Sequence, residues 1–318
     1  MTRVALLGAT GTIGRATAAA LIEAGHDVVA MVRRQPAEPI PGVTMRRADP
    51  ADPVSLARDG FANEAFDAVV SCMASRTGLP RDAWAIDHKA HSHVLAAARK
   101  AGAAHFVLLS AICVQKPRLA FQRAKLAFET ELVASGLRYS IVRPTAFFKS
   151  LSGQIERVRG GKPFLLFGDG TLTACKPISN RDLAAYLVGC LTDPDRWNKV
   201  LSIGGPGPAI TPREQGEALF ALTGVEAKFR SVPPGFLAGI ASALGLAARV
   251  VPPLATKAEL ARIGHYYATE SMLVLDPATG RYDAALTPET GTDTLLDHYR
   301  AVLCGEAAAD ERGDHAVF

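Results

Sequence analysis

The chain has 318 residues, of which 48% are hydrophobic, and this is enough for one large α/β domain with an appended lobe or for two domains. The 35 basic and 31 acidic residues are spread without a block of like charge, which argues against a nucleic-acid partner. Five scattered cysteines lack C-x-x-C spacing, so neither a disulfide framework nor a metal site is expected. The sequence starts without the pattern of a secretory signal, and we expect a cytoplasmic protein.

The first half of the chain alternates short apolar runs with helical patterns, which is typical of βαβ units around a parallel sheet. Strands are predicted at Arg3–Leu7, Asp27–Val32, Val43–Arg47, Phe66–Ser71, His105–Leu109 and Arg138–Val142. Helices are predicted at Thr12–Ala24, Val54–Gly60, Ala83–Ala101 and Leu119–Ser135. The predicted fold class is therefore α/β, with a Rossmann-type doubly wound parallel sheet over residues 1–145.

After Pro144 the pattern is less regular, and residues 146–305 are predicted to form a smaller, mostly helical C-terminal substrate lobe, interleaved with the core sheet. A flexible tail is expected at 306–318. Further elements are predicted at Phe147–Arg159 (helix), Phe164–Phe167 and Ala174–Ile178 (strands), Asn180–Leu191 (helix) and Val200–Ile203 (strand).

Residues Phe236–Ala248 form an uncharged apolar stretch between two proline pairs. The stretch is too short to span a bilayer, which takes about 20 residues. We expect a buried helix of the lobe here. The alternatives are a wall for a large apolar ligand and a contact with a membrane surface.

Three glycines, Gly8, Gly11 and Gly14, lie between the first predicted strand and the first predicted helix. Glycines allow a tight turn there, and the N–H groups of the helix N-terminus bind a pyrophosphate, so we predict a dinucleotide site. Arg33 and Arg34 follow the second strand, where guanidinium groups suit the 2′-phosphate of NADPH, although a solvated surface is the alternative for each. The predicted cofactor contacts are Gly8, Thr10, Gly11, Thr12, Ile13, Gly14, Arg33, Arg34, Asp49, Ser71, Cys72, Lys125 and Pro144.

Three of these contacts rest on position along the chain. Asp49 follows the third strand, where it either binds the adenine amino group or starts the turn with Pro50. Ser71 and Cys72 follow the fourth strand, where the backbone is expected to pass beside the nicotinamide ribose. Nothing about Cys72 itself indicates redox chemistry.

The glycine motif and strand order resemble the short-chain dehydrogenase/reductase superfamily, in which a Ser and a Tyr-x-x-x-Lys motif act together. Ser110 and Lys125 match the serine and the lysine, and are the predicted catalytic residues, whereas Phe121 replaces the tyrosine and has no proton to give. Two alternatives stay open: Lys125 as an exposed helix lysine, and Ser110 as a strand-end residue bonded to backbone.

A narrower resemblance rests on six segments: Ser110–Pro117, Phe121–Glu129, Val142–Ser150, Phe167–Gly170, Ala174–Ser179 and Ile263–Met272. Together they resemble the NADPH-dependent divinyl chlorophyllide 8-vinyl reductases, atypical members of that superfamily in which the phenylalanine is part of the pattern. The resemblance runs from Val4 to about Leu303. It implies reduction of the 8-vinyl group of divinyl (proto)chlorophyllide to ethyl in (bacterio)chlorophyll synthesis, with a Mg-tetrapyrrole as partner and a peripheral contact with photosynthetic membranes.

The expected chemistry agrees with a missing phenol. Hydride added to a vinyl group leaves charge that spreads into the conjugated ring, so no oxyanion needs a proton; water, Ser110, Tyr266 or Tyr267 is the candidate donor to the inner vinyl carbon. The predicted substrate contacts are Phe121, Phe147, Phe148, Lys176 and Tyr266. Two rival functions are an NmrA-type NADP(H)-sensing regulator without catalysis and an isoflavone-reductase-like double-bond reductase.

Overall fold

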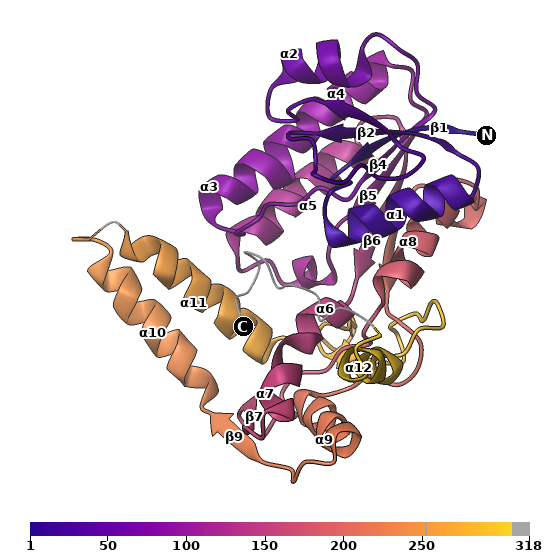
Figure 1. Cartoon of the computed structure of the whole chain (residues 1–318). Coiled ribbons are helices and arrows are strands. Elements are labelled where there is room, and N and C mark those ends of the chain that lie inside the picture. Colours follow the sequence, from indigo (N-terminus) through magenta and orange to yellow (C-terminus); the bar gives the residue numbers. More distant parts are fainter. Residues whose placement is uncertain (252, 307–318) are drawn as a thin grey trace. The chain divides into compact units, whose positions relative to one another are not determined.

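The computed structural model describes residues 1–251 and 253–306, and these form two compact units (Figure 1). The first unit comprises Met1–Pro144 and Asn180–Ile203, and the second comprises Thr145–Ser179 and the chain from Gly204 onward. One boundary between the units follows Pro144, and the first unit takes up the chain again for residues 180–203. Of the predicted tail, residues 307–318 lie outside the described residues.

The first unit is built on a parallel sheet that has seven strands in the described residues, in the order β3-β2-β1-β4-β5-β6-β8. These strands are β1 (Arg3–Leu7), β2 (Asp27–Val32), β3 (Thr44–Arg47), β4 (Ala68–Ser71), β5 (His105–Leu109), β6 (Arg138–Pro144) and β8 (Lys199–Ile203). Every pairing is parallel, which confirms the predicted doubly wound sheet. The strand order reverses direction between β1 and β4, which is where ligands bind in open sheets of this kind.

Helices connect these strands. They are α1 (Thr12–Glu23), α2 (Pro53–Ser55), η1 (Leu56–Phe61), α3 (Pro80–Ala83), η2 (Trp84–Ala90), α4 (His91–Lys100), η3 (Ile112–Gln115), α5 (Ala120–Val133), α8 (Asn180–Gly189) and η5 (Pro194–Arg196). The predicted helix over 83–101 is a continuous run of α3, η2 and α4, in which η2 has the wider π-helical turn. Such turns are rare and often mark functional positions.

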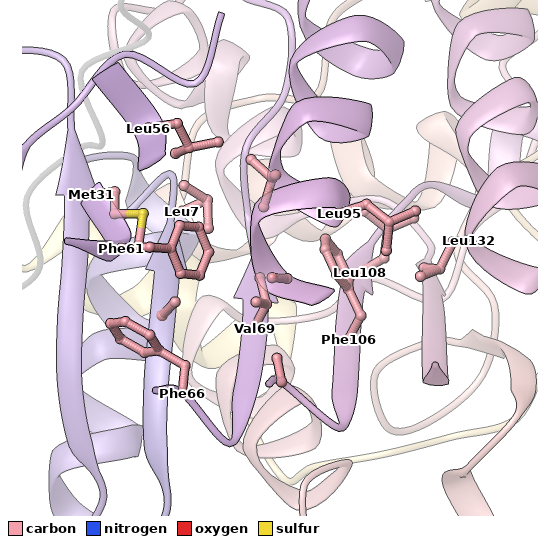
Figure 2. Packing of buried hydrophobic residues seen from close by; sticks show 14 of the residues in the cluster. Leu7, Met31, Leu56, Phe61, Phe66, Val69, Leu95, Phe106, Leu108 and Leu132 are labelled. Carbon is pink, nitrogen blue, oxygen red and sulfur yellow. The ribbon is translucent and has the colours of Figure 1, made fainter. Parts of the chain in front are cut away.

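The core of the first unit lies between the sheet and its helices, and Figure 2 shows part of it. Leu7, Val69 and Phe106 come from three neighbouring strands and are fully buried. Phe106 contacts Phe128 of α5 with ring centroids 5.7 Å apart. These strands are apolar on both faces, as expected where helices cover a parallel sheet on both sides.

The second unit is mostly helical. Its elements are α6 (Phe148–Leu151), η4 (Ser152–Gln154), α7 (Ile155–Arg159), β7 (Phe164–Phe167), α9 (Pro212–Thr223), β9 (Phe229–Val232), α10 (Pro234–Ala247), α11 (Leu254–Thr269), β10 (Val274–Leu275), β11 (Tyr282–Asp283) and α12 (Leu295–Leu303). β7 pairs with β9 in parallel, and β10 with β11 antiparallel. A core that includes Phe148, Phe164, Leu219 and Tyr299 joins helices from α6 to α12.

Two predictions for this unit are wrong. Ala174–Ile178 is not a strand: Cys175 makes single bridges to Ile210 and Met272, and Ile178 makes one to Phe147. Pro177 lacks the N–H that a continuous ladder needs. The apolar stretch is a helix, α10, but it is not buried, because Ala241 is its only buried residue and all of α10 is described. No helix of the described chain is both long and apolar enough to cross a membrane.

Candidate functional site

The glycine loop between β1 and α1 has room for glycine alone at two of its three glycine positions, Gly8 and Gly14. Gly8 has φ +75°, and a Cβ placed on it would lie 2.6 Å from the carbonyl carbon of Cys72. A Cβ on Gly14 would lie 2.0 Å from the carbonyl oxygen of Gly8. No side chain fits at such distances, so the loop packs directly against itself and against the backbone that follows β4.

Gly11 differs because the space on its side is open. A Cβ there would meet the Gly8 carbonyl oxygen at an ordinary 3.5 Å, and both Gly11 and Thr10 are exposed. Gly11 is the N-cap of α1 and makes no side-chain hydrogen bond to the first turn, which also has no acidic residue. The positive end of the α1 dipole is therefore presented to an anion. This cradle fits the pyrophosphate of a dinucleotide.

Arg33 and Arg34 lie just beyond the end of β2, and both are exposed. Neither makes an ion pair with any residue that the structure describes. Asp49 is engaged locally, since its carboxylate accepts a hydrogen bond from the backbone N–H of Ala51 at 2.9 Å. The turn is one of the two roles predicted for Asp49, and contact with adenine stays a prediction.

Ser71 ends β4 and Cys72 follows it next to the glycine loop, and their side chains point into the protein. The Ser71 hydroxyl lies 2.9 Å from Nε2 of buried His91, whose Nδ1 lies 2.8 Å from the Ile86 carbonyl oxygen. The Cys72 thiol lies 3.5 Å from the Thr17 hydroxyl. Burial raises the pKa of Cys72 to about 11, so the thiol is protonated and unreactive at neutral pH.

His91 makes the first unit sensitive to acid. Burial disfavours the imidazolium and lowers the pKa of His91 from 6.5 to about 4. Below pH 6.5 the unfolded chain therefore binds a proton at His91 that the folded chain does not bind. The folding stability that is present above pH 6.5 is lost as the pH falls towards 4. From the size of the shift we expect a loss of roughly 3 kcal/mol.

The expected result is measured by urea unfolding of wild type and His91→Asn between pH 7 and 4.5. Burial also lowers the pKa of His105 to about 4 and lowers that of His26, so wild type should lose stability with a slope that is one proton steeper than that of the variant. Equal slopes would show that His91 does not titrate in this way.

Lys125 lies on α5 and is paired with a buried carboxylate. Its Nζ atom is 3.1 Å from Oδ1 of Asp87, and the two side chains are 12% and 0% exposed. The same oxygen of Asp87 accepts the backbone N–H of Ser75 at 3.0 Å. Among the described residues, the other oxygen, Oδ2, has no hydrogen-bond partner although it is buried. Lys125 is therefore not an ordinary exposed lysine.

Sequence reasoning missed Asp87. It lies in η2, inside a helical pattern, and no spacing motif links it to Lys125 38 positions later. A single aspartate at a position that the helical period predicts to be buried is the one signal available. Removing either partner of such a pair leaves an uncompensated buried charge, which is strongly destabilising.

Ser110 occupies the predicted place after β5, but its hydroxyl is already bound. It donates to Oε1 of Glu129 at 2.5 Å, and Arg143 forms an ion pair with the same carboxylate. Ser110 and Glu129 are each only 4% exposed. The hydroxyl of Ser110 is thus bonded to a side chain, whereas one of the alternatives placed it on backbone. A catalytic role for Ser110 stays a prediction. Glu129 and Arg143 were not identified as a pair by the sequence.

Phe121 lies one turn before Lys125 on α5 and is 9% exposed. Its neighbour Gln122 fixes the start of the helix, because its side chain accepts from the Leu119 N–H and donates to the Cys113 carbonyl oxygen. Position 121, where the superfamily resemblance would place a tyrosine, is therefore an ordinary, well-anchored helix position. It simply carries no hydroxyl.

The predicted substrate residues of the second unit have internal contacts. Phe148 is 5% exposed in the core of that unit, and Tyr266 is 3% exposed. Lys176 is also buried, with Nζ 2.6 Å from Oε1 of Glu289 and 3.2 Å from the Thr287 carbonyl oxygen. These are structural roles, and contact of these residues with a substrate stays a prediction. Phe147 is partly exposed.

Comparison with known proteins identifies the family. Residues 8–194 match the model of an NAD(P)H-binding family. The divinyl chlorophyllide a 8-vinyl-reductase, chloroplastic, of Oryza sativa subsp. indica is 48% identical to this chain over 333 aligned residues, which cover 100% of this chain and 82% of that protein. The protein of the same name from Arabidopsis thaliana is 46% identical over 330 residues, covering 98% of this chain and 79% of that protein.

Solved structures show the same fold. An NADPH-dependent quinone oxidoreductase from Escherichia coli, complexed with NADPH, matches with a TM-score of 0.64 over 94% of this chain and 99% of its own, at 19% identity. Identity this low supports the fold and says nothing of the substrate. Taken with the glycine cradle and the full-length relatives, the chain belongs to the divinyl chlorophyllide a 8-vinyl-reductase family of NAD(P)H-binding proteins.

Proposed function

We propose that the protein reduces the 8-vinyl group of divinyl chlorophyllide or protochlorophyllide to ethyl, with NADPH, in chlorophyll or bacteriochlorophyll synthesis. The observation that carries the proposal is the full-length likeness to divinyl chlorophyllide a 8-vinyl-reductases at 46% to 48% identity. A shared glycine loop alone would support only a nicotinamide cofactor, whereas this likeness extends through the second unit, where a substrate lobe is expected.

The residues of the first unit are suited to hold the dinucleotide. The backbone of Gly8–Gly14 and the start of α1 would bind the pyrophosphate, and Arg33 and Arg34 would bind the 2′-phosphate. Lys125 would hold the hydroxyls of the nicotinamide ribose, kept in place by Asp87 at 3.1 Å. When bound, NADPH supplies the hydride.

The remaining task of the protein is to orient the vinyl group and to deliver a proton. Phe121 cannot donate one, and in a vinyl reduction the negative charge spreads into the tetrapyrrole ring, so no carbonyl oxygen requires a phenol. The Ser110 hydroxyl donates to Glu129 and would have to turn away from it to protonate a substrate. Water is therefore the favoured donor to the inner vinyl carbon, and orientation of the reactants is the main catalytic contribution.

The test is to incubate the purified protein with NADPH and divinyl chlorophyllide and to follow the Soret band. Loss of the conjugated vinyl group is expected to shift this band to the blue, with one NADPH consumed for each pigment converted. A protein that binds NADPH but converts no pigment would overturn the proposal and favour the regulatory rival. Conversion of a phenolic enone but not of the pigment would favour the isoflavone-reductase rival.

Cofactor preference is tested by Arg33→Ala. Loss of one guanidinium from the 2′-phosphate is expected to raise the Kd for NADPH roughly tenfold, with little change for NADH. Arg99→Ala is the matched control, because Arg99 is an exposed arginine on α4. An equal loss of affinity for both cofactors, measured by fluorescence titration, would contradict the assignment of Arg33 to the 2′-phosphate.

A further inference from the structure

Helix α10 is uncharged along its whole length and is largely uncovered. Phe236, Gly239, Ala243 and Leu246 follow one another at spacings of three and four residues, so they share one side of the helix. Val250 continues this spacing in the turn after α10, and all five residues are exposed. We call these five residues the apolar strip. Phe236 is 58%, Leu246 63% and Val250 84% exposed, and Val251 beside them is 46% exposed. Isolated exposed hydrophobics need no explanation, but a continuous strip does.

In the part of the chain that the structure describes, α10 packs chiefly against α11. The helix runs alongside α11, and the two form a hairpin within the second unit (Figure 1). Gly245 lies on the packed side, where a Cβ would come within 3.1 Å of the Arg262 guanidinium, and Ala241 is buried there. A helix that is apolar on all sides is stable where an apolar medium surrounds it, and α11 supplies that medium on one side alone.

The apolar strip offers nothing for specific polar recognition. The one side-chain hydroxyl on α10 belongs to Ser242, and it donates back to the Ala238 carbonyl oxygen at 2.9 Å. A helix whose only side-chain hydroxyl is bonded to its own backbone suits hydrocarbon, because lipid tails offer no hydrogen-bond partners. A protein partner of high specificity would require polar groups around the apolar contact.

The charges around the hairpin are positive. Residues 226–262 contain five basic and two acidic side chains. The acidic ones are paired, Glu226 with Lys228 and Glu259 with Arg262. The other three cations, Arg230, Arg249 and Lys257, are exposed and make no ion pair in the described chain. This charge complements an anionic lipid surface, and it opposes a symmetric contact between two copies of the hairpin.

We propose that the apolar strip of α10 and the adjoining turn at Val250–Val251 bind the surface of a membrane that contains anionic lipids. With 14 residues rising 1.5 Å each, α10 is about 21 Å long and lies in the interface, because a span needs about 30 Å. Arg230, Arg249 and Lys257 contact the headgroups, and the strip enters the acyl boundary. The proposal goes beyond the reductase activity, and its tests contain neither pigment nor turnover.

The first test is flotation of the full chain with vesicles of phosphatidylcholine alone or with 30 mol% phosphatidylglycerol. Wild type is expected to float with the anionic vesicles and to be released by high salt. Phe236→Asp/Leu246→Asp is expected to weaken binding by at least roughly tenfold, because each substitution removes an apolar side chain that would enter the acyl boundary. Leu286→Asp is the matched control, since Leu286 is 49% exposed in the same unit but lies outside the hairpin.

The headgroup contacts are tested by charge reversal. Arg249→Glu/Lys257→Glu is expected to abolish the preference for anionic vesicles, whereas Lys162→Glu/Arg281→Glu, which changes two exposed cations elsewhere in the unit, is expected to leave it unchanged. If both double variants lost the preference for anionic vesicles equally, the proposed role of the hairpin would be overturned. NADPH titration of each variant reports whether the first unit remains folded.

A reporter that needs no destabilising change gives the second test. Phe236→Trp is expected to show a blue-shifted emission that brominated lipids quench, whereas Leu286→Trp is expected to show neither. The absence of quenching at residue 236 in vesicle-bound protein would overturn the proposal. So would a dimer in lipid-free buffer that Phe236→Asp/Leu246→Asp converts to monomer, because the strip would then be covered by a second copy.

Discussion

Substitution of Lys125 by methionine is expected to lower kcat/KM for vinyl reduction by roughly 100-fold, because the group proposed to position the nicotinamide ribose is removed. Methionine retains an apolar stem of similar length, so the packing of α5 is kept. The variant also leaves the carboxylate of Asp87 without its cation, 3.1 Å away in wild type, in a fully buried position. An uncompensated buried charge is destabilising in its own right.

A double variant separates these two effects. Asp87→Asn/Lys125→Met removes both charges, and is expected to recover much of the thermal stability that Lys125→Met loses while remaining as inactive. Lys100→Met, at an exposed position on α4, is the control for a lysine change of no consequence. Steady-state kinetics with varied NADPH measure the activity of each variant, and thermal melts measure its stability. Full activity of the double variant would remove Lys125 from the site.

Replacement of Gly14 by alanine is expected to abolish dinucleotide binding and to lower the free energy of unfolding by about 4 kcal/mol or more, which is exceptional for a single methyl group. The added Cβ would lie 2.0 Å from the Gly8 carbonyl oxygen and 2.9 Å from the Ala9 Cα, both parts of the backbone. Nothing flexible is available to give way, so the turn itself has to move.

Gly25→Ala at the other end of α1 is the matched control. Gly25 has φ +76°, but no atom lies within 4 Å of the position that a Cβ would occupy. Its substitution is expected to cost only the conformational penalty, about 1 kcal/mol, with NADPH affinity unchanged. Isothermal titration and urea unfolding of the two variants decide the matter, and a Gly14→Ala protein that still binds NADPH at wild-type affinity would refute the steric argument.

The parts of this fold that follow from the sequence are those fixed by local rules. The strands of the first unit are apolar runs bounded by turns, Gly8 has a positive φ in the turn after β1, and Gly14 lies against the carbonyl of Gly8 six positions earlier. The phenylalanine at position 121 could likewise be placed on α5 from its spacing to Lys125. The period of apolar residues and the spacing of motif residues can be read directly from the sequence, so they predict these local elements.

The parts that the sequence did not predict depend on partners distant in the chain. Asp87 and Lys125 meet across two helices, and Glu129 joins Ser110 to Arg143 across two strands and a helix. No pattern marks such pairs. The burial of α10 was predicted wrongly for a related reason: hydrophobic composition indicates that a surface avoids water, but not what covers it.

The return of residues 180–203 to the first unit has a consequence for biosynthesis. Strand β8 pairs with β6 and forms the outer strand on that side of the sheet, yet it is synthesised after residues 145–179 of the other unit. A nascent chain that has emerged only as far as Pro144 therefore has β6 as a bare edge, available to any extended segment nearby. The sheet can be completed only after Ile203 leaves the ribosome, and a chaperone that shields β6 during this interval would protect the chain from aggregation.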